Sequence, residues 1–117
     1  MIVGIGLDVV EIDRIKKAYI KNKRFAHKVL TNEEFKLFSG LKGKRQYEFL
    51  AGRFSVKEAF AKAMGTGIGK VSFLDVELLP DPLGKPIVTQ SPFKGNVWVS
   101  ITHTDNLAAS QVILEKS

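Results

Sequence analysis

The sequence predicts a single α+β domain in which a long central helix packs on an antiparallel sheet. Three observations predict this fold: an apolar N-terminal segment, a helical pattern from Lys44 to Met64, and several short β-like segments after residue 70. Strands near both ends of a chain with helices between them are typical of the α+β class. A length of 117 residues suffices for one hydrophobic core and leaves no room for two ordinary domains, so we take residues 1–117 as one domain.

The N-terminal segment Ile2–Leu7 is apolar and is predicted to form a short strand. It contains Gly4 and Gly6, and glycines inside a strand usually mark the close approach of another backbone or of a ligand. A helix is predicted from about residue 11, because apolar residues recur at helical spacing at Ile12 and Ile15.

Two further helices are predicted between residues 31 and 64. Thr31–Glu34 has the sequence of a capping box, which opens a short helix that Gly40 closes. The long helix runs from Lys44 to Met64, and the glycine-rich segment Gly65–Gly69 ends it. On one face of the long helix we place Tyr47, Leu50, Ala51, Phe54, Glu58 and Ala61. The only acid on this otherwise apolar face is Glu58.

The remainder of the chain has the character of β-structure. Polar and apolar residues alternate in Val71–Leu79, and Pro80–Gly84 has the composition of a turn. The last two predicted strands are joined by a hairpin connection at His103–Asn106. The predicted strands after the turn are Lys85–Thr89, Val97–Thr102 and Leu107–Leu114.

The charge of the chain is unevenly distributed. There are 18 Lys and Arg residues against 12 Asp and Glu, a formal net charge of +6. Seven of the basic residues fall within Arg14–Lys28, a segment without an acid. This predicts an acidic or polyanionic partner, such as nucleic acid, a membrane surface, a phosphate-rich cofactor or an acidic protein. A merely solubilising face fits the charge equally well.

Several classes of site are excluded by composition or spacing. The absence of cysteine excludes disulfides, thiolate metal sites and a cysteine nucleophile, and it fits a reducing compartment. No apolar run approaches the roughly 20 residues of a membrane span, and the first residues lack the basic start of a signal peptide. The glycines match neither a dinucleotide fingerprint nor a P-loop. Two histidines are too few for most zinc sites.

Two carboxylates are the main candidates for chemistry. An ionised Glu58 on the inward face of a helix is costly unless it is paired, hydrogen-bonded or bound to a cation. A structural interpretation pairs it with Lys62, four residues later. Asp8 ends the apolar first strand, where it could face a ligand or cap the following helix. Two carboxylates with a lysine one turn away would suit Mg²⁺ held between protein oxygens and substrate phosphates.

Four segments of the chain resemble a known family, and the resemblance extends from Ile2 to about Leu114. These segments are similar to holo-acyl-carrier-protein synthases, the small bacterial phosphopantetheinyl transferases. The Lys-Glu-Ala-x-x-Lys core at residues 57–62, followed by Gly-Thr-Gly at 65–67, is specific for this family when it occurs together with an N-terminal aspartate, here Asp8, at this distance. The segments are Gly4–Ile15, Phe54–Ile68, Gly84–Pro86 and Val99–Thr104.

The resemblance implies a definite activity. The family transfers the 4′-phosphopantetheine arm of coenzyme A to a serine hydroxyl on acyl carrier protein and releases 3′,5′-ADP, in support of fatty acid biosynthesis. Its members are homotrimers whose active sites lie between neighbouring subunits. A cytoplasmic, Mg²⁺-dependent enzyme with no nucleic-acid or membrane partner is therefore expected.

The resemblance also implies roles for individual residues. Asp8 and Glu58 match the Mg²⁺ ligands, and Lys62 matches a catalytic lysine that contacts the coenzyme phosphates. Gly65, Pro86, His103 and Thr104 match contacts to the nucleotide end of coenzyme A, and Arg45 and Arg53 are expected near its phosphates. The expected carrier-protein contacts are Arg14, Lys21, Arg24, Phe25 and Lys28.

The departures from the family pattern are small. The family more often has alanines at Ser55 and Val56, and serine at Thr102. Lysines at positions 21 and 28 replace arginines, which keeps the charge but loses the bidentate fork.

Three questions stay open at the level of sequence. The general base is Glu58, a metal-bound water or a carboxylate near Glu34, and we favour Glu58 or a water that it orients. A small basic nucleic-acid-binding module is an alternative function that rests on charge alone. A purely structural subunit is a third hypothesis, although such a protein has no reason to keep an inward-facing Glu58.

Overall fold

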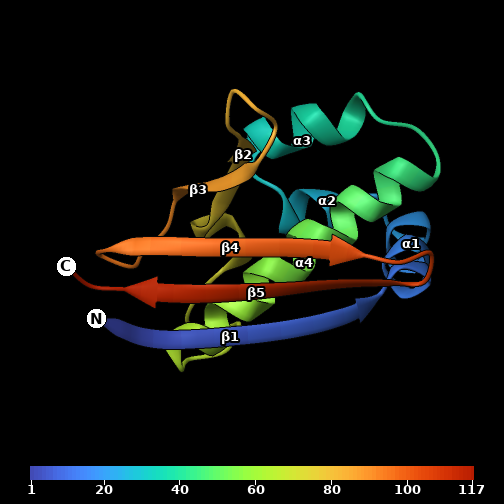
Figure 1. Ribbon diagram of the computed structural model, residues 1–117. Coiled ribbons are helices and arrows are strands. Elements are labelled where there is room, and N and C mark those ends of the chain that lie inside the picture. Colours follow the sequence, from blue (N-terminus) through green and yellow to red (C-terminus); the bar gives the residue numbers. More distant parts are fainter.

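A helix of 21 residues, α4 (Lys44–Met64), crosses one face of a three-stranded antiparallel sheet in the computed structural model, which describes residues 1–117. Figure 1 shows the three strands side by side with α4 behind them. The strand order is β1-β5-β4, so the first and last strands of the chain are neighbours. The strands are β1 (Ile2–Glu11), β4 (Asn96–His103) and β5 (Leu107–Glu115). The predicted α+β class is confirmed.

Three short helices pack against α4, and a two-stranded hairpin lies next to the third of them (Figure 1). The helices are α1 (Ile12–Lys21), α2 (Arg24–Val29) and α3 (Asn32–Ser39), and the hairpin pairs β2 (Glu77–Pro80) with β3 (Pro86–Gln90). The capping box predicted at the start of α3 is present. The predicted bounds of α4 are confirmed, and Gly65 ends the helix in the left-handed conformation at φ 79°.

The glycines of β1 allow α4 to lie directly on the sheet. A Cβ atom on Gly6 would stand 1.8 Å from the carbonyl oxygen of Ala59, and one on Gly4 would stand 2.3 Å from that of Ala63. The close approach predicted for these glycines is therefore an approach of backbone to backbone. The helix crosses the sheet obliquely: Gly52 lies against Ile101 of β4, whereas Ala59 and Ala63 lie against β1.

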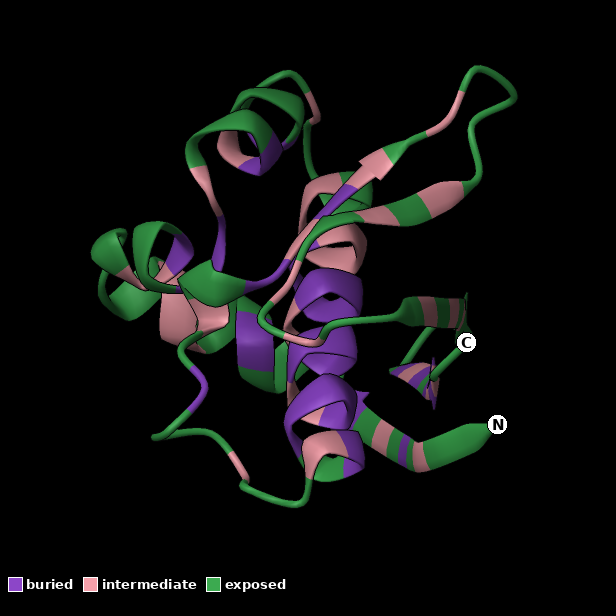
Figure 2. Ribbon diagram, turned by 90° about the vertical axis from the view of Figure 1, so that its left-hand side faces the viewer, coloured by how far each residue is buried: buried purple, intermediate pink, exposed green.

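The two faces of the three-stranded sheet differ in exposure. The inner face supplies Val112 and Leu114 to the core beneath α4, whose middle turns are buried almost all round (Figure 2). The outer face is uncovered, although it is apolar. Its most exposed members are Ile5, Leu7, Val9 and Trp98, each more than half exposed.

Three segments differ from the prediction. The first strand runs on to Glu11, because β5 pairs with it as far as Leu107. The helix predicted from about residue 11 ends at Lys21, and a second helix, α2, follows it; the Asn22 side chain accepts the Arg24 backbone N–H at the break between them. The strand predicted at Val71–Leu79 begins instead as a 3₁₀ turn, Phe73–Asp75, which the Ser72 side chain caps before β2 starts. Such local side-chain bonds compete with strand pairing.

Candidate active site

Asp8, in β1, and Lys62, in α4, form an ion pair at the edge of the sheet. Lys62 Nζ donates to Asp8 Oδ1 at 3.0 Å and to the backbone carbonyl of Leu7 at 3.1 Å. The Asp8 side chain is 12% exposed and the Lys62 side chain 52%. Asp8 lies within β1 and does not cap α1, whose N-cap residue is Glu11. The capping alternative for Asp8 is thus wrong.

Glu58 lies one turn before Lys62 on α4, and it is half-buried. Partial burial raises the pKa of the Glu58 carboxyl; the nearby negative charge of Asp8 raises it further, and Lys62 opposes both effects. The pairing of Glu58 with Lys62, weighed as a structural alternative, is absent, because Lys62 pairs with Asp8. We call Asp8, Glu58 and Lys62 the acidic half-site.

One oxygen of the acidic half-site has no partner in the chain. Asp8 Oδ2 is buried and accepts no hydrogen bond, an arrangement that is costly without a cation or a donor. Two carboxylates that repel each other, one of them with an orphaned oxygen, fit a hard divalent cation such as Mg²⁺. No third acid or histidine joins them. The residues present therefore suit an ion that keeps water and phosphate oxygens as its other ligands.

A second group of predicted residues gathers at the β4 edge of the sheet, around a cavity of about 270 Å³. Arg45, Arg53, Pro86 and His103 all line it, together with Glu48. An adjoining cavity of about 310 Å³ shares both arginines and Pro86. We use the name arginine half-site for Arg45, Glu48, Arg53, Pro86 and His103. Its two guanidinium groups could bind phosphates.

His103 and Thr104 differ in how free their side chains are. His103 Nδ1 lies 3.5 Å from Glu48 Oε2, and half of the His103 side chain is exposed. Thr104 Oγ1 accepts the backbone N–H groups of Asn106 and Leu107, so its hydroxyl already stabilises the turn between β4 and β5. Of these two residues, His103 is therefore the freer to meet a ligand.

The two half-sites lie on different flanks of α4. At about 100° per residue, Glu58 stands about 140° around the helix from Arg53, and about 15 Å along it from Glu48. The half-sites also lie at opposite edges of the sheet, since Asp8 is in β1 and His103 is in β4. Gly65, which follows Lys62 at the end of α4, falls on the acidic side. The structure thus separates residues that the resemblance assigns to one coenzyme.

Sequence reasoning missed the pairing of two buried residues beside the arginine half-site. Glu34 and Lys57 are fully buried and form an ion pair at 2.5 Å, and Arg53 is only 7% exposed beside them. Burial lowers the pKa of the Arg53 guanidinium, and the charge of Glu34 opposes this. A buried, paired Glu34 is not placed to take a proton from a substrate, and Glu58 or a water that it orients stays the base that we favour. The capping-box sequence signalled where Glu34 lies in its helix, but nothing signalled its partner.

The basic segment predicted to meet a partner lies on α1 and α2 and is open to solvent. Arg14, Lys21, Arg24 and Lys28 are exposed. Phe25 is half-buried, and its ring lies 6.0 Å from that of Phe54. The structure therefore has an exposed, positively charged surface that includes one half-buried aromatic ring.

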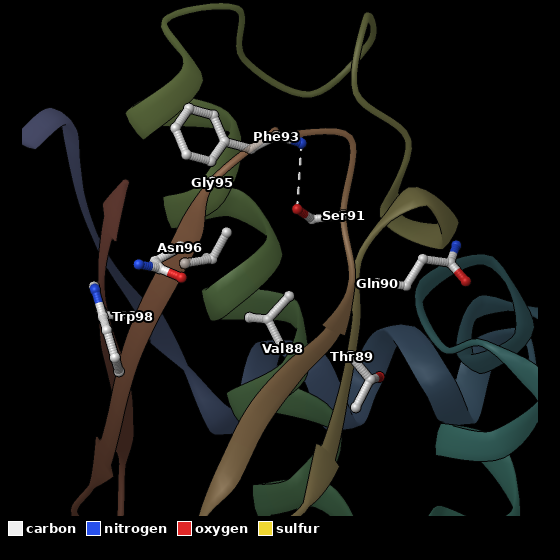
Figure 3. Close-up of a pocket in the computed structure, with 9 residues that line it drawn as sticks. Val88, Thr89, Gln90, Ser91, Phe93, Gly95, Asn96 and Trp98 are labelled. Atoms are coloured by element: carbon white, nitrogen blue, oxygen red, sulfur yellow. Dashed lines mark hydrogen bonds between the residues drawn. The ribbon is translucent and has the colours of Figure 1, made fainter. Parts of the chain in front are cut away.

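A further cavity, of about 320 Å³, lies between β3 and β4, away from both half-sites. Figure 3 shows Thr89, Ser91, Asn96 and Trp98 around it. No charged side chain lines this cavity, so it lacks what a diphosphate or a metal ion needs.

Comparison with known proteins assigns the chain and its fold to one class of enzyme. Residues 4–112 match the family model of the 4′-phosphopantetheinyl transferase superfamily. The chain belongs to this family, and it is an enzyme of that class. None of its helices has the length and apolar character needed to cross a bilayer.

Its relatives include several holo-[acyl-carrier-protein] synthases. The one from Latilactobacillus sakei is 60% identical over 99% of both chains, and the one from Streptococcus uberis is 56% identical over 99% of this chain and 98% of its own. A crystal structure of a holo-(acyl-carrier-protein) synthase from Bacillus anthracis in complex with CoA (3′,5′-ADP) is 50% identical. It matches with a TM-score of 0.93 and covers 100% of this chain and 99% of that one.

Proposed function

We propose that this protein transfers the 4′-phosphopantetheine group of coenzyme A to a serine hydroxyl of an acyl carrier protein. The observation that carries the proposal is the acidic half-site: Asp8 with an orphaned buried oxygen, Glu58 with a raised pKa, and Lys62 beside both. The names of the relatives and the CoA bound in the Bacillus anthracis structure support the same substrates.

In this reaction the serine oxygen forms a bond to the phosphorus that carries pantetheine. The bond between that phosphorus and the bridging diphosphate oxygen breaks, and 3′,5′-ADP leaves with the electron pair. The serine proton must go to a base. Glu58, directly or through a water that it orients, is our candidate, because it is the carboxylate of the acidic half-site that makes no ion pair within the chain.

Asp8 and Glu58 would hold the Mg²⁺, with Asp8 Oδ2 as the free ligand atom. When bound, the ion neutralises charge on the diphosphate oxygens. Lys62 is held at the same place by its contact with Asp8 Oδ1. Its ammonium group can stabilise the negative charge that develops on the leaving 3′,5′-ADP.

The arginine half-site is proposed to bind the nucleotide end of coenzyme A. Arg45 and Arg53 supply positive charge in one cavity, and His103 and Pro86 complete its wall. Gly65 and Thr104 are proposed as further contacts to the coenzyme, as the resemblance implies. For Thr104 the backbone is the more suitable contact, because its hydroxyl is engaged in the turn.

The separation of the two half-sites supports an active site shared between copies of the chain. A homotrimer would place the acidic half-site of one subunit beside the arginine half-site of the next. The uncovered apolar face of the sheet, with Leu7, Val9 and Trp98 more than half exposed, supports such an assembly, because a face of this kind is normally buried.

The exposed basic residues of α1 and α2 are proposed to dock the carrier protein. Arg14, Lys21, Arg24 and Lys28 form the positive surface, and Phe25 supplies an apolar contact. Positive charge attracts an acidic partner and speeds the encounter. The proposed setting is fatty acid biosynthesis in the cytoplasm.

The direct test is transfer of a labelled arm from coenzyme A to apo carrier protein, with and without Mg²⁺. We expect transfer that requires Mg²⁺ and that is absent in the Asp8→Ala and Glu58→Ala variants, whose circular dichroism should match the wild type. A wild-type protein that binds neither coenzyme A nor carrier protein would refute the proposal. Tight, salt-sensitive binding to DNA that does not depend on Asp8 would favour the nucleic-acid alternative.

A further inference from the structure

Glu34 is the only fully buried acidic residue of the chain, and three donors fix its carboxylate. Oε1 accepts from Lys57 Nζ at 2.5 Å and from the backbone N–H of Thr31 at 2.9 Å. Oε2 accepts from the backbone N–H of Leu78 at 2.8 Å. The side chain therefore stands in one place, joined to α3, α4 and β2.

Lys57 is as completely buried as Glu34. Its Nζ donates to the carbonyl of Val29, at the end of α2, at 2.6 Å, as well as to Glu34. Lys57 and Glu34 together form a neutral pair, which makes their burial tolerable.

Arg53 is the third charged group in this region, and its buried Nε has no hydrogen-bond partner in the chain. Its Nε lies 3.7 Å from Glu34 Oε2, beyond hydrogen-bonding distance, and is buried without a partner. One face of the guanidinium lies 4.3 Å from the centre of the Phe49 ring. Arg53 also lines both cavities of the arginine half-site.

Among the fully buried groups the charges do not balance, because one carboxylate faces two cations. Two further acids lie nearby: Glu77, whose charge acts on Lys57, and Glu48, which lines the cavity and lies 3.5 Å from His103. Glu34 is the only acid whose charge acts on Arg53. A buried cation that lacks a full counter-ion is costly, and an anion that enters the cavity would relieve that cost. Glu34 is close enough to Arg53 to hold it by charge and too far to occupy its donors, so the terminal nitrogens stay available for the ligand.

We propose that Glu34, held by Lys57, is a positioning residue that keeps the Arg53 guanidinium in place for a phosphate group of the nucleotide. This inference rests on the proposed function, in which the arginine half-site takes the nucleotide end of coenzyme A. Glu34 touches no substrate and acts through Arg53. It also joins α3 and β2 to α4, so the test must separate positioning from stability.

The experiment is a double-mutant cycle read by the dissociation constant for 3′,5′-ADP, measured by calorimetry on the full chain. The variants are Glu34→Gln, Arg53→Met and the combination. We expect Glu34→Gln to weaken binding about tenfold when Arg53 is present, as misplacement of a binding group does. In the Arg53→Met background it should change binding less than about twofold, because the residues act as one unit. Glu33→Gln, at an exposed position one residue earlier in α3, is the matched control and should leave binding unchanged.

Glu34→Gln leaves Lys57 buried and unpaired, so it is liable to unfold the protein. The cycle is therefore run in parallel with Glu34→Gln/Lys57→Met, which removes both charges of the pair and keeps similar volumes. This double variant should also bind 3′,5′-ADP about tenfold more weakly and lose that effect without Arg53. In the transfer assay it should raise the KM for coenzyme A and change kcat less than about twofold, since a group used equally in ground and transition states affects KM.

Two results would overturn the inference. An equal loss of 3′,5′-ADP binding with and without Arg53 would show that Glu34 acts only through the fold. No loss in the presence of Arg53 would show that it does not position that residue. If the wild-type chain itself does not bind 3′,5′-ADP, the proposed function of the cavity fails and this role fails with it, which is a distinguishable outcome.

Discussion

Lys62 Nζ donates to Asp8 Oδ1 at 3.0 Å, across from α4 to β1. Lys62 therefore neutralises the carboxylate of another element and leaves Glu58, its neighbour one turn away on the same helix, without an ion pair. A lysine and a metal ion would share Asp8 in this arrangement, one on each oxygen, since Oδ2 is buried and free. Lys62 could then stabilise the negative charge on the leaving group while Asp8 Oδ2 binds the metal ion.

This arrangement predicts that Lys62→Met loses catalysis but keeps metal binding. We expect kcat for phosphopantetheine transfer to fall roughly 10²-fold or more, because a cation near developing negative charge is lost. Binding of Mn²⁺, used as a paramagnetic probe, should be unchanged or tighter, because the acidic half-site becomes more negative. Lys70→Met, an exposed lysine in the loop after α4, is the control. Weaker Mn²⁺ binding in Lys62→Met would contradict the division of Asp8 between lysine and metal.

The two carboxylates of the acidic half-site predict that removing either charge abolishes metal-dependent activity. Asp8→Asn and Glu58→Gln should abolish Mg²⁺-dependent transfer, because each removes a charged ligand from a site that has only two. Neither variant should lower the melting temperature by more than about 4 °C, and Glu58→Gln is expected to raise it, since it removes a carboxylate destabilised by burial and by Asp8.

Asp13→Asn, on the exposed part of α1, is the control for both variants and should keep full activity. Retained Mg²⁺ dependence in the Asp8→Asn variant would mean that the ion binds elsewhere.

Local sequence signals identified much of the fold. The bounds of α4 follow from an uninterrupted helical pattern that ends in glycine, and the capping box located the start of α3. Both features depend on residues a few positions apart. The structure of Val71–Leu79 was harder to predict from its alternating sequence. The Ser72 side chain caps a 3₁₀ turn there, and the strand begins only after this turn.

The site shows the limit of local signals more clearly. Asp8 and Glu58 were expected together, and the raised pKa of Glu58 agrees with their proximity. The partnership of Glu34 with Lys57 joins residues on different helices, and no periodic pattern encodes such a pair. The separation of the half-sites depends on the strand order β1-β5-β4 and on the path of α4 across it, which are tertiary properties.

The basic face of α1 and α2 predicts that charge reversal weakens carrier binding without harming the chemistry. Arg24→Glu should raise the KM for acyl carrier protein about tenfold and leave kcat at saturating carrier within about twofold. Arg24 is exposed and makes no ion pair within the chain, so its loss should not disturb the fold. The wild-type KM should rise with salt, and that of the variant should rise less.

Lys94→Glu makes the same charge reversal in the loop between β3 and β4 and serves as the control. An equal effect of both substitutions would show that net charge, rather than this face, attracts the carrier.

The contact between α4 and β1 predicts a large effect at a single glycine. Gly6→Ala would place a Cβ atom 1.8 Å from the carbonyl oxygen of Ala59, and neither backbone can yield without separating helix and sheet. We expect the free energy of unfolding to fall by at least about 3 kcal/mol, measured by urea denaturation.

Gly40→Ala is the matched control for this substitution. The nearest atom to its Cβ would be 3.6 Å away, and its φ of −81° suits any residue, so the change should be less than about 1 kcal/mol. A Gly6→Ala protein of normal stability would mean that α4 does not lie against β1 as described.

The apolar outer face of the sheet predicts that a charge there dissociates the assembly. Leu7, 62% exposed, lies midway along β1 on this face, and Leu7→Glu should convert the proposed trimer to monomers in analytical ultracentrifugation. Transfer activity should fall with it, because the half-sites of neighbouring subunits separate. Leu83→Glu introduces the same charge at a leucine that is 95% exposed, in the turn between β2 and β3, and should change neither property.

Subunit mixing tests directly whether the two half-sites of one active site come from different copies of the chain. Asp8→Asn damages only the acidic half-site, and Arg53→Met damages only the arginine half-site, so each variant alone should be nearly inactive at coenzyme A concentrations far below KM. In a trimer that contains both variants, about one site in three should combine two intact halves. Co-expression with two affinity tags, followed by purification on both, yields the mixed trimers for assay. We expect them to recover activity well above the mean of the two variants. Activity no greater than that mean would show that each site is complete within one subunit.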